Sequence, residues 1–517
     1  MRKPLIFTVF VSGFSSLAVE MAASRLLGNV FGTSNLVWAS IIGLILIYLA
    51  LGYFLGGYWA DRSPHTRTFY RILIWASVMV ALVPAVSKPV LRAAADAFDQ
   101  LQLGILFGSF SAVLVLLFIP ITLLGTASPF AIKLGVSQSD QLGRTSGKIY
   151  AISTLGSFIG TFLPVLLFIP LIGTYRTFLL SGFLLLVTAL ICYALTDGWK
   201  AILPYLWAPV LVIALWIWGV NGQIKNTTGQ VYESESAYNY IQVLEQDGYR
   251  FLRLNEGQGI HSVYHPTQLN YWGSWEQVLV GPFFNEAPYL PEQVDRIAVV
   301  GLAAGTTARQ ATLAFENVVI DGWEIDPEIV KVGREYFDMN EPNLNVYVQD
   351  GRWGLEKSEY LYDIISVDAY RPPYIPYHMT TQEFFQIARD HLTEKGVLVI
   401  NVGRGNTDRR LINSLGSTIL SVFPSVHVVD IPNTFNSIIF ATNQPTSSEN
   451  LQANLNLLLQ SGDTPQLLLE SVTLAAQNLQ GPVTASQVFT DDKAPIEWIT
   501  NTMVMDFLFS DDMTGMQ

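Results

Sequence analysis

Seven long apolar stretches in the first 220 residues constrain this chain more than any other feature. Each can cross about 30 Å of hydrocarbon as a helix, and one or two could be buried core helices, but seven in succession predict a multi-pass membrane domain over residues 1–222. The basic start "MRKPLIFTVF" runs into the first stretch, so we interpret it as a helix and not as a removed signal peptide. The stretches lie near residues 4–30, 36–60, 70–94, 103–132, 147–173, 176–196 and 200–220.

The loops between these stretches predict how the domain is oriented. Ends and loops on the N-terminal side hold nine Lys and Arg residues, and those on the other side hold four. Loops rich in Lys and Arg usually stay in the cytoplasm, so the N-terminus is expected on the cytoplasmic side. The membrane is expected to be the plasma membrane. Seven crossings would then place the rest of the chain outside.

Some residues within the apolar stretches suggest specific contacts. Gly52 with Gly56, and Gly156 with Gly160, have the small-xxx-small spacing that lets helices approach closely. Glu20 and Arg25 are ionisable residues inside the first stretch, where charge is costly. Two interpretations of these residues stay open: they form a structural ion pair, or they line a polar pathway through the membrane.

The rest of the chain has a different composition. Residues 1–220 hold 13 Lys and Arg against 6 Asp and Glu, which leaves 16 against 36 in residues 221–517. Such an acidic region repels nucleic acid and attracts cations. The single cysteine, Cys192, lies in an apolar stretch, which excludes a disulfide framework and a cysteine-based zinc site. No metal-spaced histidine cluster is visible, so no metal is expected.

Short segments of β character follow residue 229, and an alternating pattern follows residue 291. "YNYIQVLEQDGYRFLRLN" alternates around Asp247-Gly248 and predicts a hairpin within a small β-rich domain, 229–290. From about residue 295, strands such as "RIAVVG" and "YDIISVD" alternate with helices such as "PEIVKVGREYF". This order predicts a doubly wound, mostly parallel α/β sheet over 291–517.

Glycines and acids follow the predicted strands at their carboxyl ends, where such sheets bind ligands. The first strand ends in the turn Gly301 to Gly305, and the next three end in Glu324, Asp350 and Asp368. Small residues let a ligand approach the backbone, and an acid after the second strand commonly binds ribose hydroxyls. A dinucleotide site is the rival interpretation, but the full G-x-G-x-x-G is missing. Acids that only cap helices are another alternative.

These motifs resemble the spermidine synthase (polyamine aminopropyltransferase) family over about residues 230–445, fused here to a membrane module. The family has a small β domain before a methyltransferase-like Rossmann domain. "SAYNYIQVLE", "LNEGQGIHS", "GWEID" and "QDG" are similar to its cofactor-binding segments. The resemblance implies a cofactor site formed by Asn239, His261, Gly301, Gly305, Glu324, Asp326, Asp350 and Gly351.

The catalytic loop of that family reads D-S-x-D-P, and this chain departs from it. "VDAYRPP" supplies the first aspartate as Asp368 but has Arg371 at the second, next to Tyr370. An arginine repels a cationic amine. Tyr271 in "YWG" stands where the family has Tyr-His-Glu, and Glu497 in the acidic segment "TDDKAPIEW" is a further candidate for binding the substrate. Two interpretations of the acids in "TDDKAPIEW" stay open: they replace the negative charge that is lost where the family's second aspartate becomes Arg371, or they form a solvated turn.

The resemblance implies transfer of an aminopropyl group from decarboxylated S-adenosylmethionine to a polyamine such as putrescine, with Asp368 as base. Two alternatives stay open. One is a catalytically degenerate sensor or transport-coupled protein that binds a polyamine or nucleoside. The other is a transferase that uses S-adenosylmethionine itself with a different acceptor. The expected partners are a small amine and the lipid bilayer, not nucleic acid, and a homo-oligomer stays open.

Overall fold

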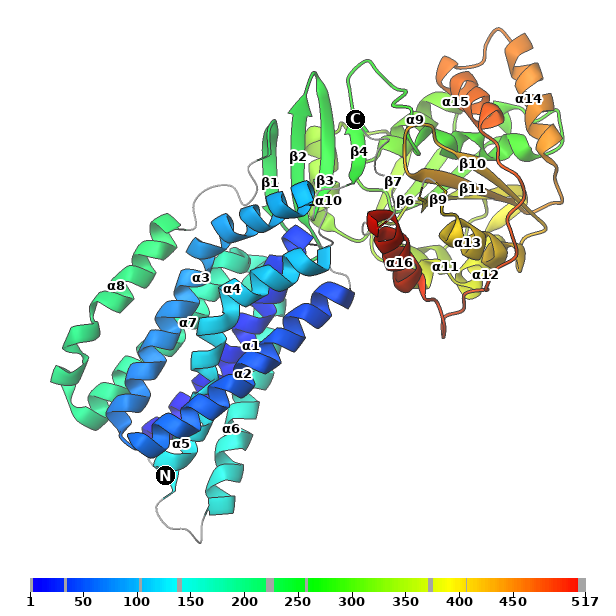
Figure 1. Ribbon diagram of the computed structural model, residues 1–517. Helices are drawn as coiled ribbons and strands as arrows, with labels where there is room; N and C mark the ends of the chain where they lie inside the picture. Colours follow the sequence, from blue (N-terminus) through cyan, green and yellow to red (C-terminus); the bar gives the residue numbers. More distant parts are fainter. Residues whose placement is uncertain are drawn as a thin grey trace. The chain divides into compact units, whose positions relative to one another are not determined.

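The computed structural model describes residues 3–31, 35–101, 105–136, 142–219, 227–255, 259–370, 375–405 and 407–509. The chain separates into two compact units, Met1–Asn226 and Thr227–Gln517, and each is described by itself (Figure 1).

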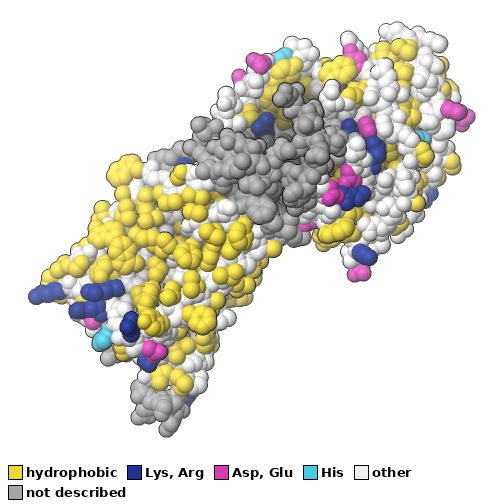
Figure 2. Space-filling model, in the orientation of Figure 1, with side chains coloured by type: hydrophobic (Ala, Val, Ile, Leu, Met, Phe, Trp, Pro, Cys, Tyr) yellow, Lys and Arg dark blue, Asp and Glu magenta, His cyan; other side chains and the backbone are white. Residues whose placement is uncertain are grey.

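The N-terminal unit is helical. Large apolar side chains are exposed along its helices, such as Phe54 at 81% and Leu166 at 72%, and hydrophobic side chains cover most of its visible surface in Figure 2. A surface of this kind suits a hydrocarbon environment. The helices are α1 (Lys3–Phe31), α2 (Asn35–Arg62), α3 (Thr66–Leu101), α4 (Ile105–Gly125), α5 (Ala127–Gly135), α6 (Leu142–Leu163), α7 (Ile169–Asp197) and α8 (Trp207–Ala214).

The predicted count of seven crossings is not confirmed. Within the described residues, five helical stretches are long and apolar enough to span a membrane, or six if the bent pair Trp199–Tyr205 and Trp207–Gly219 is one span. The difference arises in Leu142–Asp197, a single stretch of 56 residues in which the sequence predicted two crossings. Helical hydrogen bonding continues there through the π-helical turn Pro164–Phe168, although the backbone at Gly173 is not helical.

The predicted glycine contacts between helices are confirmed. A β-carbon at Gly156 or Gly160 would overlap the carbonyl groups of Phe10 and Phe14 in α1. Gly52 and Gly56 meet the backbone of Thr122 and Thr126 in the same way. Glu20 and Arg25 both lie in α1 and are partly exposed.

The C-terminal unit begins with a small antiparallel sheet. Its strands lie in the order β1-β2-β3-β4. Asp247 and Gly248 form the predicted β2–β3 turn with φ of 53° and 83°, the left-handed conformations that a two-residue hairpin turn needs. The strands are β1 (Gln230–Glu235), β2 (Tyr240–Gln246), β3 (Tyr249–Leu254) and β4 (Ile260–Tyr264).

The second sheet has seven strands in the order β10-β11-β9-β8-β5-β6-β7. The four pairs among β7, β6, β5, β8 and β9 are parallel, and β11 is antiparallel to both its neighbours. This is a Rossmann-like, methyltransferase-type sheet, as predicted. The strands are β5 (Arg296–Val300), β6 (Val319–Glu324), β7 (Leu344–Val348), β8 (Tyr362–Val367), β9 (Leu392–Gly403), β10 (Ser425–Asp430) and β11 (Asn436–Thr442).

Helices cover both faces of this sheet (Figure 1). Ile364, Val397 and Val399 pack with residues of α9, α14 and α15, whereas Ile365, Leu398 and Ile400 pack with residues of α11, α12, α13 and α16. The core therefore lies in two layers, one on each side. The helices are α9 (Thr306–Ala314), α10 (Pro327–Tyr336), α11 (Gly351–Glu356), α12 (Gln382–Asp390), α13 (Arg410–Leu420), α14 (Ser448–Gln460), α15 (Gln466–Gln477) and α16 (Ile496–Phe509).

Candidate active site

Strand order reverses between β5 and β8, and the turns that follow these two strands lie against each other. Gly301 has φ of +92°, and a β-carbon there would lie 2.7 Å from the Ala369 nitrogen. The Asp368 amide donates to the Val300 carbonyl at 3.0 Å. Gly301 thus lets the backbone after β8 rest on the turn after β5. Open α/β sheets bind ligands at such a switch point.

Asp368 lies at the end of β8 and is partly exposed. Its Oδ1 accepts a hydrogen bond of 3.1 Å from Asn401 Nδ2. Burial raises the pKa of the Asp368 carboxyl to about 6, and the hydrogen bond from Asn401 opposes that shift. At neutral pH the group is a carboxylate with more affinity for a proton than an ordinary aspartate.

Tyr370 is held close to Asp368. Its hydroxyl accepts a hydrogen bond of 2.6 Å from the Gly403 amide, which joins the β8 loop to the end of β9. Burial first, and the Asp368 charge second, raise the pKa of Tyr370. Its hydroxyl therefore stays protonated.

Glu324 ends β6 and is 8% exposed. Its two oxygens accept from the amides of Ala303, in the glycine-rich turn, and Asp326, each at 3.0 Å. Burial raises its pKa to about 7, against the effect of these hydrogen bonds. The acid and the turn that the sequence predicted as one site are therefore joined directly. Gly305 closes that turn at the start of α9 with φ of 87°.

Asp326 and Asn239 are joined in a network between the two sheets. Asn239 Nδ2 donates to Asp326 Oδ2 at 2.9 Å, and Ser236 Oγ donates to the same oxygen at 2.5 Å. Asn255 Nδ2 donates to Asn239 Oδ1 at 2.9 Å. Asp326 Oδ1 caps α10 through the Glu328 amide. These two predicted cofactor residues therefore make contacts within the protein, and Asp326 also caps a helix.

Asp350 also caps a helix. Its Oδ1 accepts from the Trp353 amide in α11 at 2.9 Å, and its Oδ2 lies 3.4 Å from His378 Nε2. The hydrogen bond with His378 is the main reason that the pKa of Asp350 is lowered. Gly351 follows, and a β-carbon there would lie 2.6 Å from Val300 Cγ1, so this glycine packs α11 onto β5.

The small sheet brings His261 next to the glycine-rich turn. Ser262, its neighbour in β4, accepts from the Ala304 amide at 2.9 Å. Burial lowers the pKa of His261 to about 4, and its Nε2 has no hydrogen-bond partner among the described residues. Tyr271 lies in the following loop, where its hydroxyl accepts from the His265 amide at 3.2 Å.

The acids near residue 491 do not form one free cluster. Asp491 makes a bidentate pair with Arg352 of α11 at 2.7 Å for each bond, and it accepts from Thr381 Oγ1 at 2.6 Å. Its charge is therefore neutralised by a cation of the protein. Glu497 lies in the first turn of α16 and is partly exposed, while Arg371 lies outside the described residues.

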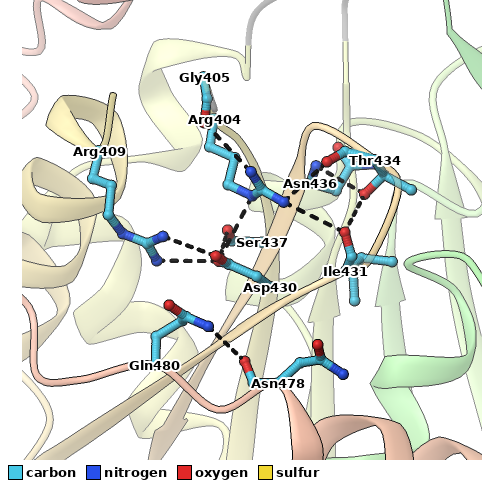
Figure 3. Close-up of polar contacts among 10 residues, drawn as sticks. All are labelled: Arg404, Gly405, Arg409, Asp430, Ile431, Thr434, Asn436, Ser437, Asn478 and Gln480. Carbon is cyan, nitrogen blue, oxygen red and sulfur yellow. Dashed lines mark hydrogen bonds and ion pairs between the residues drawn. The ribbon is translucent and has the colours of Figure 1, made fainter. Parts of the chain in front are cut away.

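Two features of this edge of the sheet were not predicted. Asn401, the partner of Asp368, lies within β9 directly after the buried run Val397–Ile400, so its position near the end of an apolar run was a usable signal. A polar cluster lies beyond it (Figure 3), where Arg409 binds Asp430 through bonds of 2.9 and 3.1 Å. Arg404 Nε lies 3.7 Å from the same carboxylate.

Known proteins resemble the C-terminal unit. Residues 291–452 match the family model of the spermine/spermidine synthase domain. A probable polyamine aminopropyl transferase of Bifidobacterium longum is 34% identical over 287 residues, 52% of this chain but only 62% of that protein. Polyamine aminopropyltransferase 2 of Aquifex aeolicus is 21% identical over 458 residues, 86% of this chain and 88% of the relative. A crystal structure of a probable spermidine synthase from Corynebacterium glutamicum matches 52% of this chain and 97% of its own, at 21% identity and a TM-score of 0.40.

Proposed function

We propose, from the match of residues 291–452 to the family model of the spermine/spermidine synthase domain, that the chain is a membrane-anchored aminopropyltransferase. The donor would be decarboxylated S-adenosylmethionine and the acceptor a small amine such as putrescine. Asp368 would act as the base. The observation that carries the proposal is the placement of the Asp368 carboxylate at the strand-order switch, beside the glycine-rich turn that binds Glu324.

The residues at the strand ends fit a nucleoside donor. Glu324 offers carboxylate oxygens for ribose hydroxyls, and Asp350 offers one for a base amino group. The small residues in the turn from Gly301 to Gly305 would let the donor approach the backbone closely. The donor, when bound, supplies a carbon that its sulfonium already activates.

The task of the protein is then to prepare the amine. An alkylamine has a pKa of roughly 10 and is protonated at neutral pH. Moving its proton to an ordinary aspartate is uphill by about 8 kcal/mol, but to a carboxyl with a pKa of about 6 the cost falls to about 5 kcal/mol. Asn401 holds the Asp368 carboxylate in place, and the same carboxylate can orient the nitrogen for attack.

The direct test is turnover by the full chain in detergent. Decarboxylated S-adenosylmethionine with putrescine should yield spermidine, and Asp368→Asn should lower kcat by about 100-fold or more. Asp463→Asn, an exposed aspartate between α14 and α15, is the matched control and should keep full activity. An inactive wild type across several amines would contradict the proposal.

A second candidate is binding of a nucleoside or amine without turnover. It is favoured by Asn239 and Asp326, two predicted cofactor residues that bind each other at 2.9 Å. Calorimetry that detects binding of the donor, while wild type produces no product, would support this candidate over the first.

A further inference from the structure

The C-terminal unit holds a pocket that the proposed reaction does not use. It has a volume of about 530 Å³, within the range of about 300–1,000 Å³ of small-molecule sites. Asp368 is not among its lining residues. The lining residues are Trp272, Pro432, Asn433, Leu459, Leu469, Glu470, Thr473, Leu474, Gln477 and Asn478.

One carboxylate lies in this pocket without a cation among the lining residues. Glu470 Oε2 accepts from Asn270 Nδ2 and its Oε1 accepts from Gln466 Nε2, each at 2.7 Å. Both donors are neutral amides, so they hold the carboxylate in place and leave its charge uncompensated. Among the described residues, no Lys, Arg or His lines the pocket.

An aromatic ring borders the same pocket. Trp272 is 58% exposed, and its amide donates to Asn270 Oδ1 at 3.0 Å. Asn270 therefore holds Trp272 with its oxygen and Glu470 with its nitrogen. The face of a tryptophan attracts organic cations, and the leucines of the lining suit an alkyl chain.

The walls of the pocket are fixed by the cluster in Figure 3. Arg404 Nη2 donates to the Thr434 carbonyl at 3.0 Å and holds the turn that contributes Pro432 and Asn433. The Asp430 amide donates to the Asn478 carbonyl at 3.2 Å, which ties the end of α15 to β10. The arginines of this cluster are engaged with Asp430 and with loop carbonyls, and neither lines the pocket.

From this combination we infer that the pocket is a second binding site, specific for a linear alkylammonium ion. The ammonium group binds Glu470 and the Trp272 ring, and the alkyl chain lies along Leu469 and Leu474. The excess of acidic residues in 221–517 adds a field that attracts such cations. The inference does not depend on transfer at Asp368, because it concerns binding alone.

Equilibrium dialysis with radiolabelled putrescine tests the site, using the full chain in detergent and an Asp368→Asn background that removes the proposed base. Saturable binding is expected, weakening as salt is raised, and 1,4-butanediol, which has the chain but no charge, should not compete. Adding Glu470→Gln should weaken binding by about tenfold or more, corresponding to the loss of one charge-assisted contact. Glu449→Gln, an exposed acid in the first turn of α14, is the matched control.

A second variant guards against a folding defect. Thr473→Lys places a cation in the pocket from the partly exposed surface of α15, and it should abolish putrescine binding while the melting temperature stays near that of the parent. Binding that survives both changes, or no saturable binding in the parent, would overturn the second site. Failure of the proposed transferase would appear separately, as absent turnover with putrescine binding retained.

Discussion

At the scale of single residues, Asp368 and Glu324 are both carboxyl groups with a raised pKa. Burial raises the pKa of both carboxyls, to about 6 and about 7, so ionisation opposes folding. The folded-state pKa lies above the unfolded value of about 4. Stability is therefore highest below that value and falls as the pH rises through the folded-state pKa.

Asp368→Asn should stabilise the protein at pH 7 while it removes activity. The shift of about two pKa units corresponds to at most about 3 kcal/mol, and the gain should shrink to about 0.5 kcal/mol at pH 4, where the wild-type carboxyl is protonated in the folded state and about half protonated in the unfolded state. Thermal or urea unfolding of the C-terminal unit at the two pH values measures this difference. Asp463→Asn serves as the control, and equal stabilisation of Asp368→Asn at both pH values would contradict the burial argument.

At the scale of elements, the residues that follow the strands are held in place by helix caps and tight turns. The alternating pattern predicted β5 to β9 and helices α9, α10 and α12 because hydrophobic periodicity is local information. The pairing of Asp326 with Asn239 joins residues 87 positions apart, and that of Arg352 with Asp491 joins residues 139 apart. Such pairs depend on tertiary packing, so neither the Asp326 network nor the neutralised Asp491 could be predicted from the sequence.

Asp350 combines a cap with a proposed ligand contact, and two substitutions separate these roles. Asp350→Asn keeps an equally good cap and should leave stability nearly unchanged, whereas Asp350→Ala should cost about 1 kcal/mol. Both should weaken binding of the nucleoside donor, because both remove the charge. Calorimetry with the donor and urea unfolding measure the two effects; donor affinity unchanged in Asp350→Asn would remove this residue from the site.

Gly301→Ala should damage the site through the backbone. The φ of +92° and the approach of 2.7 Å to Ala369 predict a loss of about 2–4 kcal/mol in unfolding free energy, and Asp368 should be displaced with its loop. Gly462→Ala is the matched control, since nothing lies within 4 Å of a β-carbon there, and it should change stability by less than about 0.5 kcal/mol. An active, fully stable Gly301→Ala would contradict the close packing of the two turns.

At the scale of the whole molecule, the number of crossings decides which compartment holds the C-terminal unit. The long apolar helices of the N-terminal half were predictable, because runs of about twenty apolar residues favour membrane-spanning helices over other structures. The count was not, because Leu142–Asp197 runs through the π-helical turn Pro164–Phe168 and is interrupted only by the non-helical backbone at Gly173. Six crossings would place both ends of the helical half on the same side, whereas five or seven would place them on opposite sides.

The proposed transferase requires the C-terminal unit to face the cytoplasm, where a charged nucleoside donor is made. Cys192 is the only cysteine and is 3% exposed, so an introduced surface thiol can be labelled selectively. Asp463→Cys should be protected from a membrane-impermeant maleimide in intact cells and labelled after lysis, as should His65→Cys in the basic loop after α2. Labelling of Asp463→Cys in intact cells would place the unit outside and oppose the enzyme.

The buried carboxylate of Asp326 also has a consequence for inheritance. It is 0% exposed, and Ser236 and Asn239 from the small sheet satisfy its Oδ2. A Rossmann half separated from that sheet would exchange these two hydrogen bonds to the carboxylate for contacts with water, a loss of about 1.5–3 kcal/mol for each bond. Recombination that separates the two β-sheets is therefore disfavoured. We expect the chain from residue 230 through residue 326 and beyond to be inherited as a single module.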